Sequence, residues 1–153
     1  MAILITGASA GFGEAMCRAF TAAGFNVVGA ARRMEKLQAL AEELGGSFYP
    51  LQMDVADPAF QENKRRHIAR ADTSSVPAAL QSLPEGFREI DCLINNAGLA
   101  LGLDSADKAD FADWQTMIQT NIVGLTFLTR QILPQMVERK SGYIINIGSI
   151  AGN

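Results

Sequence analysis

The chain begins with the sequence MAILITGASAGFGEA over residues 1–15, and this stretch decides its fold. Residues 2–6 form a short aliphatic run that ends at a glycine, which predicts a buried strand. Over residues 11–23 the apolar side chains recur at helical spacing, and Gly24 follows as a helix-ending residue. A strand that passes through a glycine-rich turn into a helix is the first half of a parallel strand–helix–strand unit.

The glycine-rich turn predicts a dinucleotide-binding loop. Gly7 permits a tight turn, Gly11 lets the backbone approach a pyrophosphate, and Gly13 lets the helix pack closely on the strand. The free N–H groups and the dipole at the helix start favour an anion there. The candidate cofactor-binding residues of this loop are Gly7, Ala8, Ser9, Ala10, Gly11, Phe12 and Gly13. The alternative is a turn that binds nothing. A triphosphate-binding loop is excluded because no Gly-Lys-Ser/Thr follows.

Beyond this unit, strand and helix patterns continue to alternate. We expect further strands over residues 26–31, 48–53, 90–95 and 143–147, and further helices over 34–44, 75–83 and 114–137. The strand segments are continuous apolar runs, which is typical of strands covered on both faces. The sequence therefore predicts an α/β fold with a doubly wound parallel sheet, the Rossmann fold.

Two arginines indicate which nicotinamide cofactor the loop would take. An NAD-binding unit has an acidic residue about 20 residues after the loop, where it binds the ribose 2′-hydroxyl. Here Arg32 and Arg33 occupy that place at the end of the second strand. A guanidinium binds a phosphate through paired, charge-assisted hydrogen bonds. We therefore expect NADP rather than NAD, the alternative being that both arginines only begin the next helix in solvent.

Composition excludes several function classes. The 153 residues suit one domain, and a net charge of −3 gives no basic field for nucleic acid or an anionic membrane. Cys17 and Cys92 lie in apolar stretches, as buried thiols in a reducing compartment do. The first apolar run is too short for a signal peptide or a membrane span. We expect a soluble cytoplasmic protein that binds no metal, no membrane and no nucleic acid.

One basic segment does not fit the alternating pattern. Residues 61–70 contain Lys64, Arg65, Arg66, His67 and Arg70, almost without apolar side chains. Clustered basic residues can bind nucleic acid, but no aromatic residues interleave with them and the net charge is negative. We therefore expect residues 59–74 to be a surface insertion, with nucleic-acid binding as the alternative.

Together, these motifs resemble the short-chain dehydrogenase/reductase family over nearly the whole chain. Residues 6–13 match its TGxxxGxG signature, and residues 95–98 match its NNAG segment. The resemblance implies that Asp54 and Val55 bind the adenine, and that Asn96, Ala97 and Gly98 lie beside the adenine ribose. It also implies that Asn121 positions a water for proton relay, and that Ser149 binds the substrate oxygen.

Longer segments are similar to a subgroup, the NADP-dependent 3-hydroxy acid or serine dehydrogenases. These segments are NNAGLALG at residues 95–102, MVERKSG at 136–142, and residues 143–152. The resemblance implies a small-molecule substrate such as L-serine or another 3-hydroxy acid, and a homo-oligomeric enzyme.

The family's catalytic Tyr and Lys have no counterpart among these residues. In the family the Tyr follows the Ser by about a dozen residues and the Lys follows the Tyr by four, which lies past Asn153. We therefore expect residues 1–153 to be an NADP-binding domain incomplete at its C-terminus, inactive alone and doubtful as an oligomer. Side chains of the long helix, Ile118, Leu125, Leu128 and Leu133, should then be partly uncovered. A non-catalytic NADP-binding module and a non-functional gene fragment are the alternatives.

Overall fold

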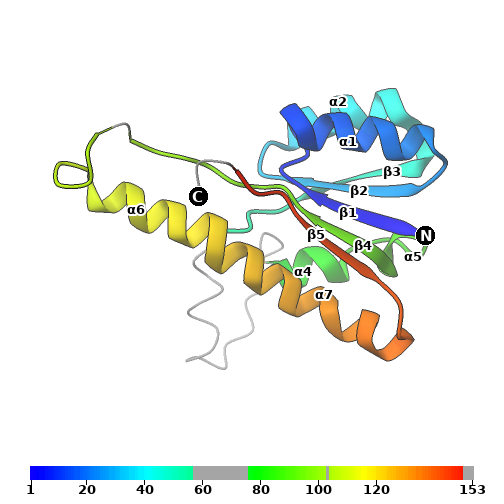
Figure 1. Ribbon diagram of the computed structural model, residues 1–153. Helices are drawn as coiled ribbons and strands as arrows, with labels where there is room; N and C mark the ends of the chain where they lie inside the picture. The colour runs from blue at the N-terminus through cyan, green and yellow to red at the C-terminus, as the bar shows by residue number, and fades with distance from the viewer. Residues whose placement is uncertain (57–75, 103, 150–153) are drawn as a thin grey trace.

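A computed structural model of the chain describes residues 1–56, 76–102 and 104–149 (Figure 1). Its strands are β1 (Ala2–Thr6), β2 (Asn26–Ala31), β3 (Phe48–Gln52), β4 (Ile90–Asn95) and β5 (Tyr143–Asn146). Its longer helices are α1 (Gly11–Ala22), α2 (Met34–Leu44), α6 (Phe111–Ile118) and α7 (Leu125–Arg139). Shorter helical segments are η1 (Gly45–Ser47), α4 (Val76–Gln81), α5 (Glu85–Arg88) and the π-helical turn η2 (Gln119–Gly124) between α6 and α7.

The five described strands form one parallel sheet in the order β3-β2-β1-β4-β5. The chain starts in the middle of the sheet, builds outward to β3, and then returns to place β4 on the other side of β1. This arrangement confirms the predicted doubly wound fold. The point at which the strand order reverses lies between β1 and β4, where such sheets bind their ligands.

Helices cover both faces of the sheet (Figure 1). Successive strand side chains point to opposite faces, so β1 contributes to two separate cores. Ile3 packs with Cys17 in the cluster beneath α1 and α2, whereas Leu4 packs with Leu128 in the cluster beneath α4 and α7. Every residue of β1 is buried, as its unbroken apolar run predicted.

The predicted boundaries agree with the structure to within a few residues. β3 and β5 each end one residue early, and α1 ends at Ala22. The last long helix begins at Phe111 instead of residue 114, because the side chain of Asp110 accepts a hydrogen bond of 2.9 Å from the Ala112 N–H and caps it. The four-residue α5 was not predicted. Pro50 is tolerated because β3 is an edge strand of the described sheet.

The helix expected over residues 75–83 is present as α4. Val76, Ala79 and Leu83 are almost fully buried against the sheet, as their spacing predicted. The basic residues 61–70 and the expected insertion 59–74 lie outside the described residues.

The expected exposure of the long helix is only partly correct. Ile118 and Leu133 are exposed, and Leu125 is half-buried. Leu128 is fully buried, so the prediction was wrong there; it lies in the core cluster under the sheet. Both cysteines are free and buried, as predicted. Among the described helices, none combines the length and the apolar character needed to span a membrane.

Candidate functional site

The carboxyl ends of the parallel strands meet at one edge of the sheet and surround a cleft of about 320 Å³. That volume is at the lower end of the range for small-ligand sites, about 300–1,000 Å³. The cleft lies where the strand order reverses. Its lining residues are Gly7, Ser9, Ala10, Ala30, Ala31, Arg32, Arg33, Met53, Asp54, Val55, Asn96, Ala97, Gly98, Leu99 and Thr120.

Most of the predicted cofactor-binding residues come together in this cleft. The structure brings together Gly7, Ser9, Ala10, Arg32, Arg33, Asp54, Val55, Asn96, Ala97 and Gly98. The other predicted residues of the loop, Ala8, Gly11, Phe12 and Gly13, do not line it. Ala8 points into the core, and the Phe12 side chain projects into solvent.

The glycine loop has the geometry of an anion cradle. Gly7 and Gly11 have φ values of 68° and 57°, in the left-handed region that favours glycine. A Cβ at Gly13 would collide with the carbonyl oxygen of Gly7, so only glycine lets α1 start this close to the loop. A Cβ at Gly11 would enter the open space in front of the loop. The bare backbone at the start of α1 therefore leaves room for a phosphate group.

Thr6 connects this loop to the segment after β4. Its hydroxyl oxygen accepts hydrogen bonds of 2.9 Å from the backbone N–H groups of Asn96 and Ala97. The side-chain amide of Asn96 also donates to the Thr6 carbonyl oxygen at 2.9 Å. The two strand ends that form the centre of the cleft are thus held in register by polar contacts.

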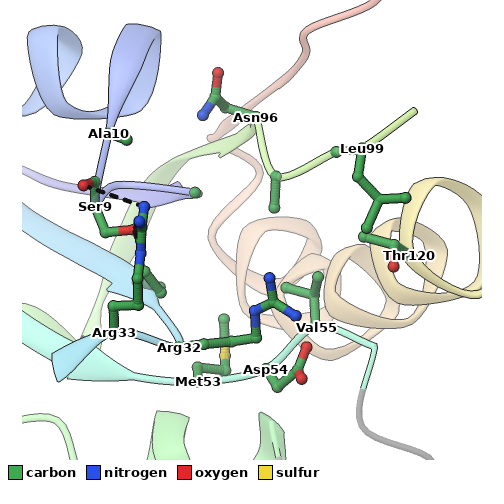
Figure 2. Close-up of a pocket in the computed structure, with 15 residues that line it drawn as sticks. Ser9, Ala10, Arg32, Arg33, Met53, Asp54, Val55, Asn96, Leu99 and Thr120 are labelled. Carbon is green, nitrogen blue, oxygen red and sulfur yellow. Dashed lines mark hydrogen bonds between the residues drawn. The ribbon is translucent and has the colours of Figure 1, made fainter. Parts of the chain in front are cut away.

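The two arginines leave the end of β2 in different directions (Figure 2). The guanidinium of Arg33 donates to the Ser9 hydroxyl oxygen from Nη2 at 2.9 Å and from Nε at 3.3 Å. Arg32 extends away from Ser9, and its backbone carbonyl accepts a hydrogen bond from Gln52. One guanidinium is therefore fixed beside the glycine loop, and a second stands at the rim of the same cleft.

The segment after β3 forms another wall of the cleft. Asp54 closes a tight turn by accepting a hydrogen bond of 2.9 Å from the Ala56 N–H. Gly124 of η2 packs so closely on Val55 that a Cβ there would collide with the Val55 carbonyl oxygen. The turn of helix η2 and the segment after β3 are thereby brought together.

The two predicted catalytic residues lie outside the cleft lining. Asn121 in η2 makes a reciprocal pair with the backbone of Leu99: its Oδ1 accepts from the N–H at 3.0 Å, and its Nδ2 donates to the carbonyl at 2.8 Å. The Asn121 side chain therefore holds the loop after β4 against the helix. Ser149 is exposed and follows β5.

Sequence reasoning missed five lining residues: Ala30, Ala31, Met53, Leu99 and Thr120. Each of them except Ala30 directly flanks a residue that the sequence did identify, and Ala30 is two residues from Arg32, so adjacency was the available signal. The described residues include no cluster of three or more His, Cys, Asp or Glu side chains that could hold a metal ion.

The sequence matches the family profile described as short chain dehydrogenase over residues 1–153. Among curated proteins, it is 48% identical over 153 residues to the NADP-dependent 3-hydroxy acid dehydrogenase YdfG of Salmonella typhi, covering 100% of this chain and 56% of that protein. It is 44% identical to serine 3-dehydrogenase of Rhizobium radiobacter, covering 99% of this chain and 54% of that protein. The chain thus spans about half the length of these relatives.

Solved structures show the same likeness. The closed form of serine dehydrogenase complexed with NADP⁺ superimposes with a TM-score of 0.87 at 47% identity, over 99% of this chain and 55% of that one. Serine dehydrogenase from Escherichia coli gives a TM-score of 0.84 at 48% identity, over 100% of this chain and 63% of that one.

Proposed function

This chain belongs to the short-chain dehydrogenase family, and we propose that its cleft binds NADP through the adenosine 2′-phosphate half of the cofactor. The observation that carries the proposal is the convergence on one cleft of the glycine loop, two guanidinium groups and the Asp54–Val55 segment. The relatives that share this stretch include enzymes named as NADP-dependent and a structure complexed with NADP⁺.

The residues of the cleft suit the parts of such a ligand. The free N–H groups at the start of α1 bind the pyrophosphate. Arg33, held by Ser9, and Arg32 at the rim bind the 2′-phosphate of NADP. In NAD this position is a 2′-hydroxyl, which donates to an acidic residue in NAD-binding units. Asp54 accepts from the adenine amino group, and Asn96, Ala97 and Gly98 lie along the ribose. When bound, NADP supplies a hydride acceptor or donor.

We further propose that residues 1–153 are the cofactor-binding domain of a longer hydroxy acid dehydrogenase, with residues 59–74 as a surface insertion. In that protein the Ser149 hydroxyl binds the substrate oxygen and Asn121 supports the proton relay. The relatives' names favour a small 3-hydroxy acid such as L-serine as the substrate. Two free buried thiols favour the cytoplasm, where cysteines remain reduced.

The proposal is tested with two fragments of the cofactor. Adenosine 2′,5′-bisphosphate carries the base, the ribose and the 2′-phosphate, whereas nicotinamide mononucleotide carries only the other half. In calorimetric titrations of the chain, the bisphosphate should bind measurably and the mononucleotide should bind far more weakly. Absent binding of the bisphosphate, or stronger binding of the mononucleotide, would contradict the proposal.

A further inference from the structure

Thr120 is a polar residue of the cleft that neither the sequence motifs nor the proposed contacts use. It lies in the π-helical turn η2, lines the cleft, and is only 8% exposed. Its hydroxyl makes no hydrogen bond with any residue in the described part of the chain. Thr120 Oγ1 is not among the fully buried unpaired side-chain oxygens of the described residues, so it is accessible from the cleft that it lines.

The other threonines of this long helix all have hydrogen-bond partners, and Thr129 Oγ1 accepts from Asn95 Nδ2 at 3.0 Å. Thr116 Oγ1 donates to the Ala112 carbonyl at 2.9 Å, and Thr126 Oγ1 donates to the Ile122 carbonyl at 2.7 Å. The hydroxyls of Thr116 and Thr126 thus bond to a carbonyl four residues earlier, as is common for threonine in helices. Thr120 does not make this bond, so its hydroxyl remains available to a molecule in the cleft.

Packing of η2 defines the part of the cleft that Thr120 faces. Gly124, one turn further on, lies directly against the Val55 backbone, and the Gln119 side-chain amide donates to the Ala56 carbonyl at 3.5 Å. In Figure 2 the Thr120 hydroxyl is directed to the side of the cleft where Val55 lies. Arg33 is held at the opposite side, against the glycine loop. Thr120 therefore faces the region proposed for the base and lies away from the phosphate-binding arginines.

We infer that the Thr120 hydroxyl hydrogen-bonds the base end of the bound dinucleotide and contributes affinity that is independent of the 2′-phosphate. This inference rests on the proposed NADP site. It adds a second kind of determinant to that site, because Arg32 and Arg33 distinguish the two cofactors and Thr120 does not. An oxygen that can both donate and accept suits the nitrogen-rich edge of a purine.

The test uses two variants of the full chain. Thr120→Val keeps the shape of the side chain and removes the hydroxyl, whereas Thr120→Ser keeps the hydroxyl and removes the methyl group. For Thr120→Val, dissociation constants from calorimetry should rise about three- to tenfold for NADP and by the same factor for NAD, as for one lost hydrogen bond. Thr120→Ser should stay within about twofold of the unchanged chain.

Stability provides a second readout. If the Thr120 hydroxyl had only a structural role, its removal would lower the stability of the chain. Without ligand, Thr120→Val should unfold at an equal or higher denaturant concentration, since no described residue pairs with the hydroxyl that it removes. Unchanged affinity in Thr120→Val would overturn the inference, as would a changed ratio of NADP to NAD affinity. A destabilised or unfolded Thr120→Val would also overturn it, by showing that the hydroxyl has a partner within the fold. If the unchanged chain binds neither NADP nor NAD, the proposed function itself fails.

Discussion

Asn96 donates two hydrogen bonds of 2.9 Å to Thr6, one from its backbone N–H and one from its side-chain amide, across the point where the strand order of the sheet reverses. Thr6 is the last residue of β1, and Asn96 directly follows β4. The same Thr6 hydroxyl also accepts from the Ala97 N–H. A single side chain thus fixes the glycine loop relative to the segment proposed to lie along the ribose.

Thr6→Val should therefore weaken both the fold and the cofactor site. It removes the acceptor of two partly buried backbone N–H groups, and each unsatisfied group costs about 1–3 kcal/mol. The free energy of unfolding, measured with denaturant, should therefore fall by about 2–6 kcal/mol for the two groups together, and NADP affinity should fall with it. Thr6→Ser keeps the hydroxyl and should lose much less. Equal behaviour of the two variants would show that the methyl group, and not the hydroxyl, is what the site requires.

Arg33→Ala and Arg32→Ala should reduce NADP affinity and leave NAD affinity unchanged. Charge-assisted hydrogen bonds contribute about 1.5–3 kcal/mol each, so each variant should raise the NADP dissociation constant by about tenfold or more. Exposed Arg130, on α7 and outside the cleft, gives a matched control: Arg130→Ala removes the same charge and should change neither affinity. Parallel losses for NADP and NAD would contradict the assignment of these arginines to the 2′-phosphate.

The buried thiols predict a pH-dependent stability. Burial raises the pKa of the Cys17 thiol from 9.0 to about 12, and burial also raises the pKa of Cys92. The folded chain therefore keeps a proton on Cys17 that the unfolded chain loses above pH 9.0. The contribution of this thiol to stability is intact below pH 9.0 and declines between pH 9.0 and about pH 12.

Thiol labelling checks the same point. A disulfide reagent should modify neither cysteine of the native chain at mildly alkaline pH, and both cysteines after unfolding. Rapid modification of the native chain would mean that the core cluster beneath α1 and α2, which contains both cysteines, opens readily. Replacing Cys17 with Ala should remove most of the decline in stability above pH 9.0.

Hydrophobic patterning was sufficient to predict most of the fold. The β1 and β4 runs are mainly apolar, and the structure buries every residue of β1 and every residue of β4 except Asp91, which is partly buried. The helix boundaries differ from the predicted ones where a local contact overrides the apolar periodicity. For example, the cap made by the Asp110 side chain begins α6 before the point where its apolar pattern begins. The burial of Leu128 was missed because the pattern along a helix does not say which tertiary surface covers it.

The candidate site was predictable only where residue type carries the chemistry. Glycines, arginines and Asp54 identified the loop, the rim and one wall of the cleft. Leu99 and Thr120 were missed because neither residue type marks a site, and both reach the cleft only through the packing of η2. The hydrogen bond between Arg33 and Ser9 also depends on backbone geometry that no motif encodes.

The 153-residue chain by itself should bind NADP without oxidising L-serine or other 3-hydroxy acids. It spans about half the length of its dehydrogenase relatives, and a general acid–base contributes roughly 10²–10⁴-fold to a rate. Absorbance at the NADPH wavelength should stay at the level of a no-protein control, even with saturating cofactor. Turnover at about 1 s⁻¹ or faster, typical of enzymes, would show that these residues contain a complete catalytic site.

The cleft should bind NADP in preference to NAD. Calorimetric titration of the same chain preparation with each cofactor, at one salt concentration, measures this directly. We expect one binding site and an NADP dissociation constant at least about tenfold below that for NAD, the difference expected from one charge-assisted contact. Equal dissociation constants, or tighter binding of NAD, would contradict it.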